Sequence, residues 1–183
     1  MTRSQIRAIE VVDPDPEWAS RFFAESERIA TILGTALVRI EHIGSTAIPG
    51  IKAKPIVDLM PLVVSIDSVD ALESEFETAG YNWYHEYGLP GRRYVNRDDV
   101  AAGKRIANVH IYQTDNPEVA RHLAFRDYLR ANPNLAAQYG AVKVQCAARY
   151  AHDIDAYNEC KGQWIKPVEL AAVTWFAERE DAG

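Results

Sequence analysis

The segment of the sequence that decides the fold is Glu41–Asp58, which reads EHIGSTAIPGIKAKPIVD. The residues before it, Leu37–Ile43, alternate in polarity and predict a strand that ends at the glycine of Gly44-Ser45-Thr46. Residues 56–64 form an apolar run around one charge, Asp58, which is typical of a strand buried on both faces. The segment therefore predicts two strands joined by a glycine turn, with a single aspartate near the start of the second.

This strand–turn–strand unit has the chemistry of a phosphate-binding site. Gly44 allows a phosphate to approach the backbone, and Ser45 offers a hydroxyl and an N–H at the expected start of a helix. Asp58 could hold a divalent metal ion that bridges the phosphates. Lys54 precedes Pro55, which keeps the backbone extended there, and it is a candidate phosphate contact.

The order and spacing of Gly44-Ser45 and Asp58 resemble the signature of the nucleotidyltransferase superfamily, and longer motifs resemble the GrpB family in particular. The resemblance covers roughly residues 8–166 and implies a nucleotidyltransferase-like fold. It also implies a link to nucleotide or coenzyme A metabolism, since relatives are found fused to dephospho-coenzyme A kinase. The matching positions are the run from His42 to Asp58, the segment HLAFRDYLR at 122–130, Tyr139, Lys143, Tyr157, Lys161, and the segment GRRY at 91–94 before His110.

The sequence departs from the active members of that superfamily at the metal-binding carboxylates. Those enzymes carry Asp-x-Asp or Asp-x-Glu on the second strand and a third carboxylate on a later strand. Here the triplet is Asp58-Leu59-Met60, and the later strand contains His110 and no carboxylate. Two-metal phosphoryl transfer needs several oxygen ligands, so the usual magnesium mechanism does not fit this chain.

Strand periodicity offers a substitute set of ligands. If the strands are neighbours with matching faces, His42, Asp58 and His110 converge. Two imidazoles and a carboxylate suit Zn²⁺, Mn²⁺ or Fe²⁺ better than Mg²⁺, or they act as general acid and base. The expected cofactor is a divalent metal ion (Mg²⁺, Mn²⁺ or Zn²⁺), and the expected substrate is a nucleoside triphosphate.

Several basic side chains are candidates for binding an anion. Arg92 and Arg93 lie in a glycine-flanked loop and are either a solvated pair or a guanidinium fork for a phosphate or carboxylate. Arg126, together with Lys143 and Lys161 on the following helices, is a candidate basic wall of a cleft. Lys104 and Arg105 are expected to be surface charges.

Length and composition predict an ordinary globular domain. The 183 residues, 48% hydrophobic and 25% charged, fit a single domain over residues 1–183. The formal net charge of −6 argues against nucleic acid or an anionic membrane as a partner and leaves a small anionic molecule as the expected one.

Cys146 and Cys160 have no metal-site spacing and are expected to be reduced thiols. With no signal sequence or membrane-spanning run, we expect a cytoplasmic protein.

The remaining patterns predict an α+β fold, with a mixed sheet and its flanking helices followed by a helical C-terminal third. Strands are expected at residues 6–12, 37–43, 56–64, 81–87, 92–96 and 107–113. Helices are expected at residues 17–33, 69–78, 117–131, from about 133, at 153–165, and in a short segment before 178.

The favoured function is an enzyme that binds a nucleotide or another phosphorylated small molecule and performs nucleotidyl or phosphoryl transfer, or an adenylation-like activation. The alternative is a non-catalytic module of the same fold that holds a nucleotide or a coenzyme A-like ligand. The acceptor, the base preference and the oligomeric state stay open.

Overall fold

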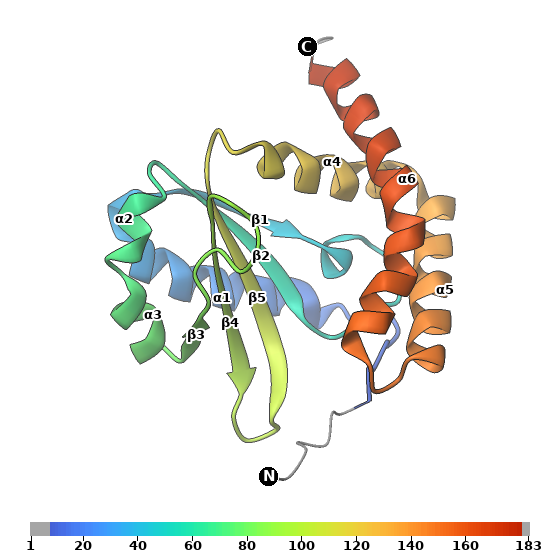
Figure 1. Ribbon diagram of the computed structural model, residues 1–183, viewed down its shortest axis with the longest axis horizontal. Coiled ribbons are helices and arrows are strands. Elements are labelled where there is room, and N and C mark those ends of the chain that lie inside the picture. Colours follow the sequence, from blue (N-terminus) through green and yellow to red (C-terminus); the bar gives the residue numbers. More distant parts are fainter. Residues whose placement is uncertain (1–7, 181–183) are drawn as a thin grey trace.

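The computed structural model describes residues 8–180 and contains one mixed sheet of five strands in the order β1-β2-β5-β4-β3 (Figure 1). β2 and β5 are parallel, and the other neighbouring pairs are antiparallel. This arrangement confirms the predicted α+β fold. The strands are β1 (Leu37–Ile43), β2 (Val57–Val63), β3 (Tyr81–Trp83), β4 (Arg92–Asp99) and β5 (Lys104–Gln113).

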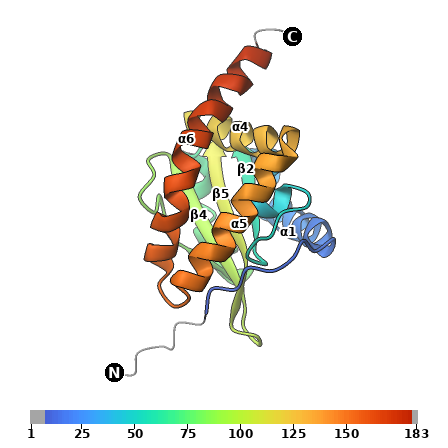
Figure 2. The same ribbon diagram turned by 90° about the vertical axis from the view of Figure 1, so that its right-hand side faces the viewer.

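Helices cover the two faces of the sheet unequally (Figures 1 and 2). Three helices, α1 (Glu17–Leu33), α2 (Asp67–Asp70) and α3 (Glu73–Thr78), share a large core with one face. The C-terminal helices α4 (Pro117–Ala131), α5 (Pro133–Arg149) and α6 (Ile154–Glu180) lie on the other side. Short 3-10 turns at Gly34–Ala36 and Ser45–Ala47 flank β1.

The central strand β2 explains why one part of the sheet stays open. Leu59 points into the core beneath α1, whereas Met60 and Leu62 pack on the opposite face against Val119 of α4. Both faces are thus buried along most of β2, as its continuous apolar run predicts. Asp58 lies nearer the start of the strand, on the same face as Met60, at the edge of the part that α4 covers.

Three predicted elements are shorter or divided in the structure. Of the strand predicted at 6–12, residues 6 and 7 lie outside the described part, and the remainder forms only an isolated bridge between Val12 and Ala53. The helix predicted at 69–78 is two short helices, α2 and α3. The strand predicted at 81–87 ends at Trp83, because His85 and Tyr87 have positive φ angles that a strand cannot accommodate.

The C-terminal helices begin close to their predicted starts. α4 has the predicted bounds, and the side chain of Asn116 accepts a hydrogen bond from the N–H of Glu118 at 2.9 Å. The two helices predicted after residue 153 are one helix, α6, which continues through Pro167. Trp164 and Val168, on either side of this proline, pack into the same cluster beneath α4 and α5. Tertiary packing therefore overrides the helix-breaking tendency of the proline.

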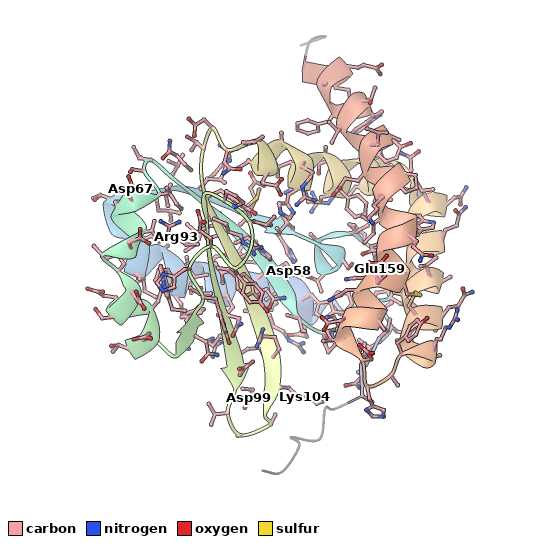
Figure 3. The ribbon with its side chains drawn as sticks, in the orientation of Figure 1. Asp58, Asp67, Arg93, Asp99, Lys104 and Glu159 are labelled. Atoms are coloured by element: carbon pink, nitrogen blue, oxygen red, sulfur yellow. A yellow bond between two sulfur atoms is a disulfide. The ribbon has the colours of Figure 1, made fainter. Side chains whose placement is uncertain are left out.

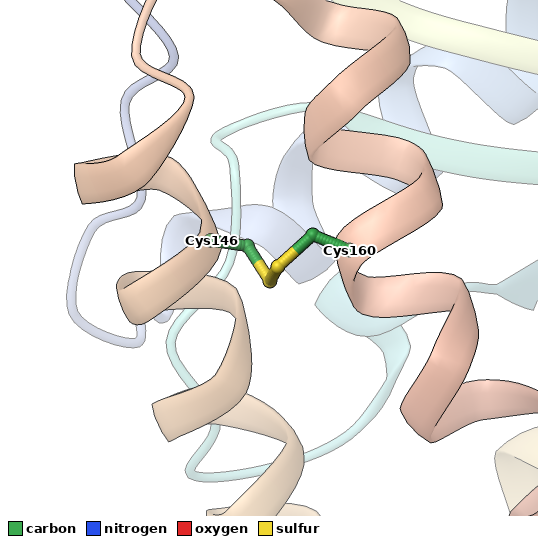
Figure 4. Close-up of a disulfide and its surroundings, with 2 residues drawn as sticks. All are labelled: Cys146 and Cys160. Atoms are coloured by element: carbon green, nitrogen blue, oxygen red, sulfur yellow. A yellow bond between two sulfur atoms is a disulfide. The ribbon is translucent and has the colours of Figure 1, made fainter.

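A disulfide joins Cys146 of α5 to Cys160 of α6, with a Cα–Cα distance of 5.9 Å (Figure 4). The expectation of two reduced thiols is therefore wrong. The two helices are neighbours, so cysteines 14 positions apart meet at their interface. Sequence spacing alone could not show that both face the same seam.

None of the helices between residues 8 and 180 combines the length and the hydrophobicity that a bilayer crossing requires.

Candidate functional site

A cavity of about 500 Å³ lies between the open part of the sheet and the helices α5 and α6. Asp58, near the middle of the molecule, belongs to its sheet side (Figure 3). The sheet and its loops contribute Ser45, Lys54, Ile56, Asp58, Tyr87, Tyr94, Arg105, Asn108 and His110. The helical side contributes Lys143, Ile154, Tyr157, Asn158 and Lys161.

The glycine turn lies directly against Asp58. Gly44 has a φ of +69°, a conformation that favours glycine. A Cβ atom at this position would lie 2.6 Å from Oδ2 of Asp58, closer than non-bonded atoms approach. Ser45 follows at the start of the short 3-10 turn and lines the cavity. The turn therefore needs glycine both for its backbone angle and for the space that the carboxylate occupies.

Replacing Gly44 with alanine is expected to destabilise the protein by about 3 kcal/mol, because backbone strain and overpacking against Asp58 add together. Gly50→Ala is the matched control, since Gly50 has a φ of +77° but a Cβ atom there would meet no other atom within 4 Å. That control should lose only about 1 kcal/mol. Urea unfolding measures both, and equal losses would contradict the close contact with Asp58.

Asp58 is held in its ionised form. Its Oδ1 accepts a hydrogen bond from Nδ2 of Asn108 at 2.9 Å and lies 3.7 Å from Nε2 of His110. Burial raises the pKa of this carboxyl, but the interactions with His110 and Asn108 and the charge of Lys54 outweigh that effect. The pKa of Asp58 is therefore below its usual range, and the cavity contains a carboxylate at neutral pH.

The tautomer of His110 follows from its second partner, Arg92. Nη1 of Arg92 lies 3.3 Å from Nδ1 of His110, and a guanidinium can only donate. Nδ1 therefore accepts, and the proton of a neutral His110 is on Nε2, which faces Asp58. His110 thus orients the carboxylate.

His42 does not join Asp58 and His110. It pairs with Leu59 across β1 and β2, so its side chain is on the face opposite Asp58, where it stacks on Phe22 of α1 at 4.5 Å between ring centroids. Its Nε2 is 2.9 Å from Oγ1 of Thr46. Burial lowers the pKa of His42 to about 4. The structure therefore brings together two of the three expected ligands.

The donor set of the cavity does not fit a two-metal site. Within residues 8–180, no three His, Cys, Asp or Glu side chains are grouped so that they could hold a metal ion. Asn108 directs its amide nitrogen at Asp58, while its Oδ1 accepts from the hydroxyl of Tyr94 at 2.9 Å. Asp58 alone could supply an oxygen to an ion that arrives with a phosphate ligand.

The helical side of the cavity contains a buried, uncompensated lysine. Lys143 of α5 is 2% exposed, and its Nζ has no hydrogen-bond partner in the described part of the chain. Its ammonium group lies 4.4 Å from the ring centroid of Tyr139. Burial and the neighbouring Lys161 lower the pKa of Lys143 to about 7. Such a group is costly to maintain in a folded protein without a counter-charge.

Two further lysines flank the ring of Tyr157. The Nζ atoms of Lys54 and Lys161 lie 5.6 Å and 5.1 Å from its centroid. Burial lowers the pKa of Lys54, and burial together with Lys54 lowers the pKa of Lys161 to about 8. The three lysines and Ser45 form what we call the basic end of the cavity, with Asp58 as the nearby carboxylate.

The three arginines named as anion contacts have other partners. Arg92 is 6% exposed and donates to the backbone oxygens of Glu86 and Tyr87. Arg93 pairs with Asp70 of α2. Arg126 donates to Glu41, to Asp127 and to the backbone oxygen of His42. All three guanidinium groups therefore already have hydrogen-bond acceptors within the protein. None of the three residues lines the cavity.

Of the other sequence candidates, Ser45, Lys54, Asp58 and His110 line the cavity, as do Lys143 and Lys161 of the basic wall. Sequence reasoning missed Asn108 and the two tyrosines, Tyr87 and Tyr94, and it was wrong to treat Arg105 as a surface charge, because Arg105 also lines the cavity. Asn108 shares the face of His110 by strand periodicity, and that signal was available. Tyr87 lies in a loop whose path no periodic pattern predicts.

The mixed sheet, with its Gly-Ser turn facing an aspartate on the neighbouring strand, has a nucleotidyltransferase-like fold. A structure of Cid1 in complex with its product ApU has a TM-score of 0.51 with this chain at 13% identity, covering 73% of this chain and 42% of Cid1. At this identity the similarity shows the fold alone. The family model described as "GrpB protein" matches residues 8–170, and the chain belongs to this family.

Relatives support this assignment over most of the chain. A crystal structure of the conserved protein GrpB from Enterococcus faecalis has a TM-score of 0.87 at 42% identity and covers 91% of this chain and 99% of that one. The UPF0157 protein YqkA of Bacillus subtilis (strain 168) is 40% identical over 96% of this chain. This chain spans 50% of the length of YqkA. A protein of Mycolicibacterium paratuberculosis (strain ATCC BAA-968 / K-10) named dephospho-CoA kinase is 32% identical over 95% of this chain, which covers 48% of that protein.

Proposed function

We propose that the protein binds a nucleoside triphosphate or a related phosphorylated molecule in this cavity, with the phosphates at the basic end. The observation that carries the proposal is the unpaired ammonium group of Lys143, buried on the cavity wall beside Lys161. Native proteins rarely leave a buried charge without a partner. A bound polyphosphate would supply the missing counter-charge to all three lysines.

The charge balance at the basic end favours a multiply charged anion. Burial lowers the pKa of Lys54, Lys143 and Lys161, and Asp58 opposes that effect at each of them. Lys161 and Lys54 lower the pKa of Lys143 further, and Lys54 lowers that of Lys161. Three cations against one carboxylate leave an excess of positive charge in a protein whose formal net charge is −6. A single carboxylate ligand would neutralise only part of that excess, whereas a di- or triphosphate matches it.

Titration calorimetry and thermal unfolding test the proposal directly. The titrants are ATP, inorganic tripolyphosphate, coenzyme A and dephospho-coenzyme A, each with and without Mg²⁺. A ligand at one hundred times its Kd adds about 2.7 kcal/mol to stability, which for a chain of this size raises the Tm by very roughly 5–10 °C. Coenzyme A and its precursor are included because the relative from Mycolicibacterium paratuberculosis is named dephospho-CoA kinase. Absence of binding by every titrant would refute the proposal.

Affinity for the anion is expected to fall as the pH rises from 7 to 9. The pKa values of Lys143 and Lys161 in the free protein are about 7 and about 8, so both lysines lose their charge over this range. The terminal phosphate of ATP, with a pKa of about 6, is mostly ionised at pH 7, and any further ionisation of a phosphate ligand at higher pH acts in the opposite direction, since it strengthens binding. Each lysine that must take up a proton when the ligand binds raises the Kd by up to about tenfold per pH unit above its pKa. Calorimetric Kd values for tripolyphosphate at four pH values measure the slope, and a flat profile would contradict the role of the lysines.

A second candidate function is transfer of a phosphoryl or nucleotidyl group from the bound ligand, and the ionised Asp58 favours it. Phosphoryl transfer depends mainly on positioning and on electrostatic stabilisation of the phosphates. The lysines would supply the stabilisation, and Asp58, oriented by His110 and Asn108, would hold the attacking hydroxyl or amine. A non-catalytic module would instead bind ligand and release neither phosphate nor pyrophosphate.

A further inference from the structure

The cavity has a second end whose chemistry differs from that of the lysines. Tyr94 of β4 pairs with His110 of β5, and Asp58 of β2 pairs with Asn108 of β5. Crossing the sheet from β2 to β4 therefore leads from the carboxylate to an aromatic surface. Tyr87, from the loop before β4, stacks on Tyr94, with ring centroids 5.0 Å apart and ring planes 13° apart. Both tyrosines line the cavity.

Tyr87 is exposed in a way that packing alone does not explain. The residue is 64% exposed, whereas Tyr94 beneath it is 8% exposed. One face of the Tyr87 ring rests on Tyr94, and the ring of Tyr84 packs beside it at 5.4 Å between centroids, yet Tyr87 stays largely exposed where it lines the cavity. A large aromatic side chain that stays exposed beside a pocket is typical of a ligand contact.

The loop that carries Tyr87 is held in a strained conformation. Tyr87 has a φ of +46° and His85 a φ of +50°, values that non-glycine residues adopt at a cost. Arg92 fixes the loop by donating to the backbone oxygens of Glu86 and Tyr87 at 3.1 Å and 2.6 Å. The same guanidinium lies 5.1 Å from the ring centroid of Tyr94. Strain of this kind persists where the surrounding structure enforces it, and it is concentrated at ligand sites.

We propose that Tyr87, supported by Tyr94, is a stacking surface for the base of a nucleotide whose phosphates occupy the basic end. This inference rests on the proposed function and makes it more specific. A bare polyphosphate or a sugar phosphate would leave the aromatic end empty, whereas a nucleotide reaches both ends. Stacking of one base on an aromatic side chain corresponds to a five- to 150-fold gain in affinity, that is, about 1–3 kcal/mol.

The test compares ATP with inorganic tripolyphosphate by titration calorimetry, in wild type and in the variants Tyr87→Ala and Tyr87→Phe. Wild type should bind ATP at least about tenfold more tightly than tripolyphosphate. Tyr87→Ala should lose most of that preference without changing the affinity for tripolyphosphate, and Tyr87→Phe should keep it. Phe23→Ala is the matched control: Phe23 is also 64% exposed but lies on α1, against the opposite face of the sheet.

The outcomes separate this inference from the proposal on which it rests. Equal affinities of wild type for ATP and tripolyphosphate would overturn the stacking role of Tyr87 and leave the phosphate site intact. An equal loss of affinity for ATP and for tripolyphosphate in Tyr87→Ala would overturn it as well. Such a loss would mean that the ring maintains the shape of the cavity and does not contact the base. Binding of neither ligand to wild type would refute the phosphate site itself. If Tyr87→Ala does not fold, Tyr87→Leu in the same comparison replaces it.

Discussion

Replacing Lys143 with methionine is expected to stabilise the free protein and, at the same time, to remove its affinity for polyphosphate. Burial lowers the pKa of this lysine from 10.5 to about 7, whereas the unfolded chain keeps the ordinary value. Folding at pH 7 therefore requires Lys143 either to lose its proton or to bury a charge. Methionine has a similar length and no charge, so the unfolding free energy at pH 7 should rise by about 2–4 kcal/mol.

The pH dependence identifies the source of this gain. A lysine whose pKa is lower in the folded state destabilises that state most at and below pH 7, and the effect disappears as the pH approaches 10.5. The difference between Lys143→Met and wild type should shrink accordingly in urea unfolding at pH 7, 8.5 and 10. Lys166→Met, on the exposed surface of α6, is the control and should change little at any pH.

The functional half of the same prediction is a large loss of binding. Without the Lys143 ammonium group, we expect the Kd for tripolyphosphate to rise by at least about a hundredfold, as for a buried charge-assisted contact. A more stable protein that no longer binds its ligand is the signature of a residue retained for function. A less stable variant at pH 7 would show that Lys143 already has a favourable partner in the free protein, and the proposed phosphate site would lose its main support.

Replacing Asp58 with asparagine is expected to separate binding from turnover. Asparagine keeps the shape of the side chain and an oxygen that can accept from Asn108, so the fold should persist. The change removes a negative charge that faces the three lysines, so tripolyphosphate should bind equally well or more tightly in metal-free buffer. Release of phosphate or pyrophosphate from ATP should fall by at least about a hundredfold, because nothing then orients the nucleophile.

The control for this variant is Asp99→Asn, at the exposed turn end of β4, far from Asp58 in Figure 3. Affinity and product release should both stay at wild-type levels there. If Asp58→Asn abolishes binding of tripolyphosphate itself, the carboxylate supports the architecture of the cavity and has no separate role in turnover. If wild type binds ATP but releases no product with any acceptor tried, the non-catalytic alternative is supported.

Most elements of the fold could be predicted because their signals are local. The amphipathic period of residues 17–33, the apolar run of β2 and the capping residue Asn116 each fix one element without reference to distant residues. The errors concern elements that depend on tertiary packing. Pro167 lies inside α6 because its neighbours pack into a core cluster, and the chain leaves the sheet at residues 86 and 87, whose backbone oxygens Arg92 holds. No pattern along the chain encodes either contact.

The candidate site was only partly predictable, for a related reason. Gly44, Ser45, Lys54 and Asp58 lie within one short segment, so their proximity follows from a single strand–turn–strand unit. His42 belongs to the same segment, but the register of β1 against β2 places its side chain on the other face. The arginines were attractive candidates by charge, yet Arg93 and Arg126 are already paired with carboxylates in space. The sequence shows which residues are charged, but the carboxylates that neutralise them can be identified only from their neighbours in the folded structure.

The disulfide between α5 and α6 makes the protein sensitive to the reduction potential of its surroundings. Cys146 lies one helical turn after Lys143, and Cys160 is next to Lys161, so the cross-link ties together the two helices that carry these lysines. A dithiol reductant that converts this disulfide to two thiols transfers two electrons and two protons and is itself oxidised to a disulfide. When a ligand binds one redox form more tightly, it shifts the midpoint potential of the disulfide, and the redox state changes the affinity for the ligand by the same free energy. Each tenfold preference of the ligand for one form shifts the midpoint potential by about 30 mV. A phosphorylated ligand that favours the cross-linked form would thereby protect the disulfide from reduction.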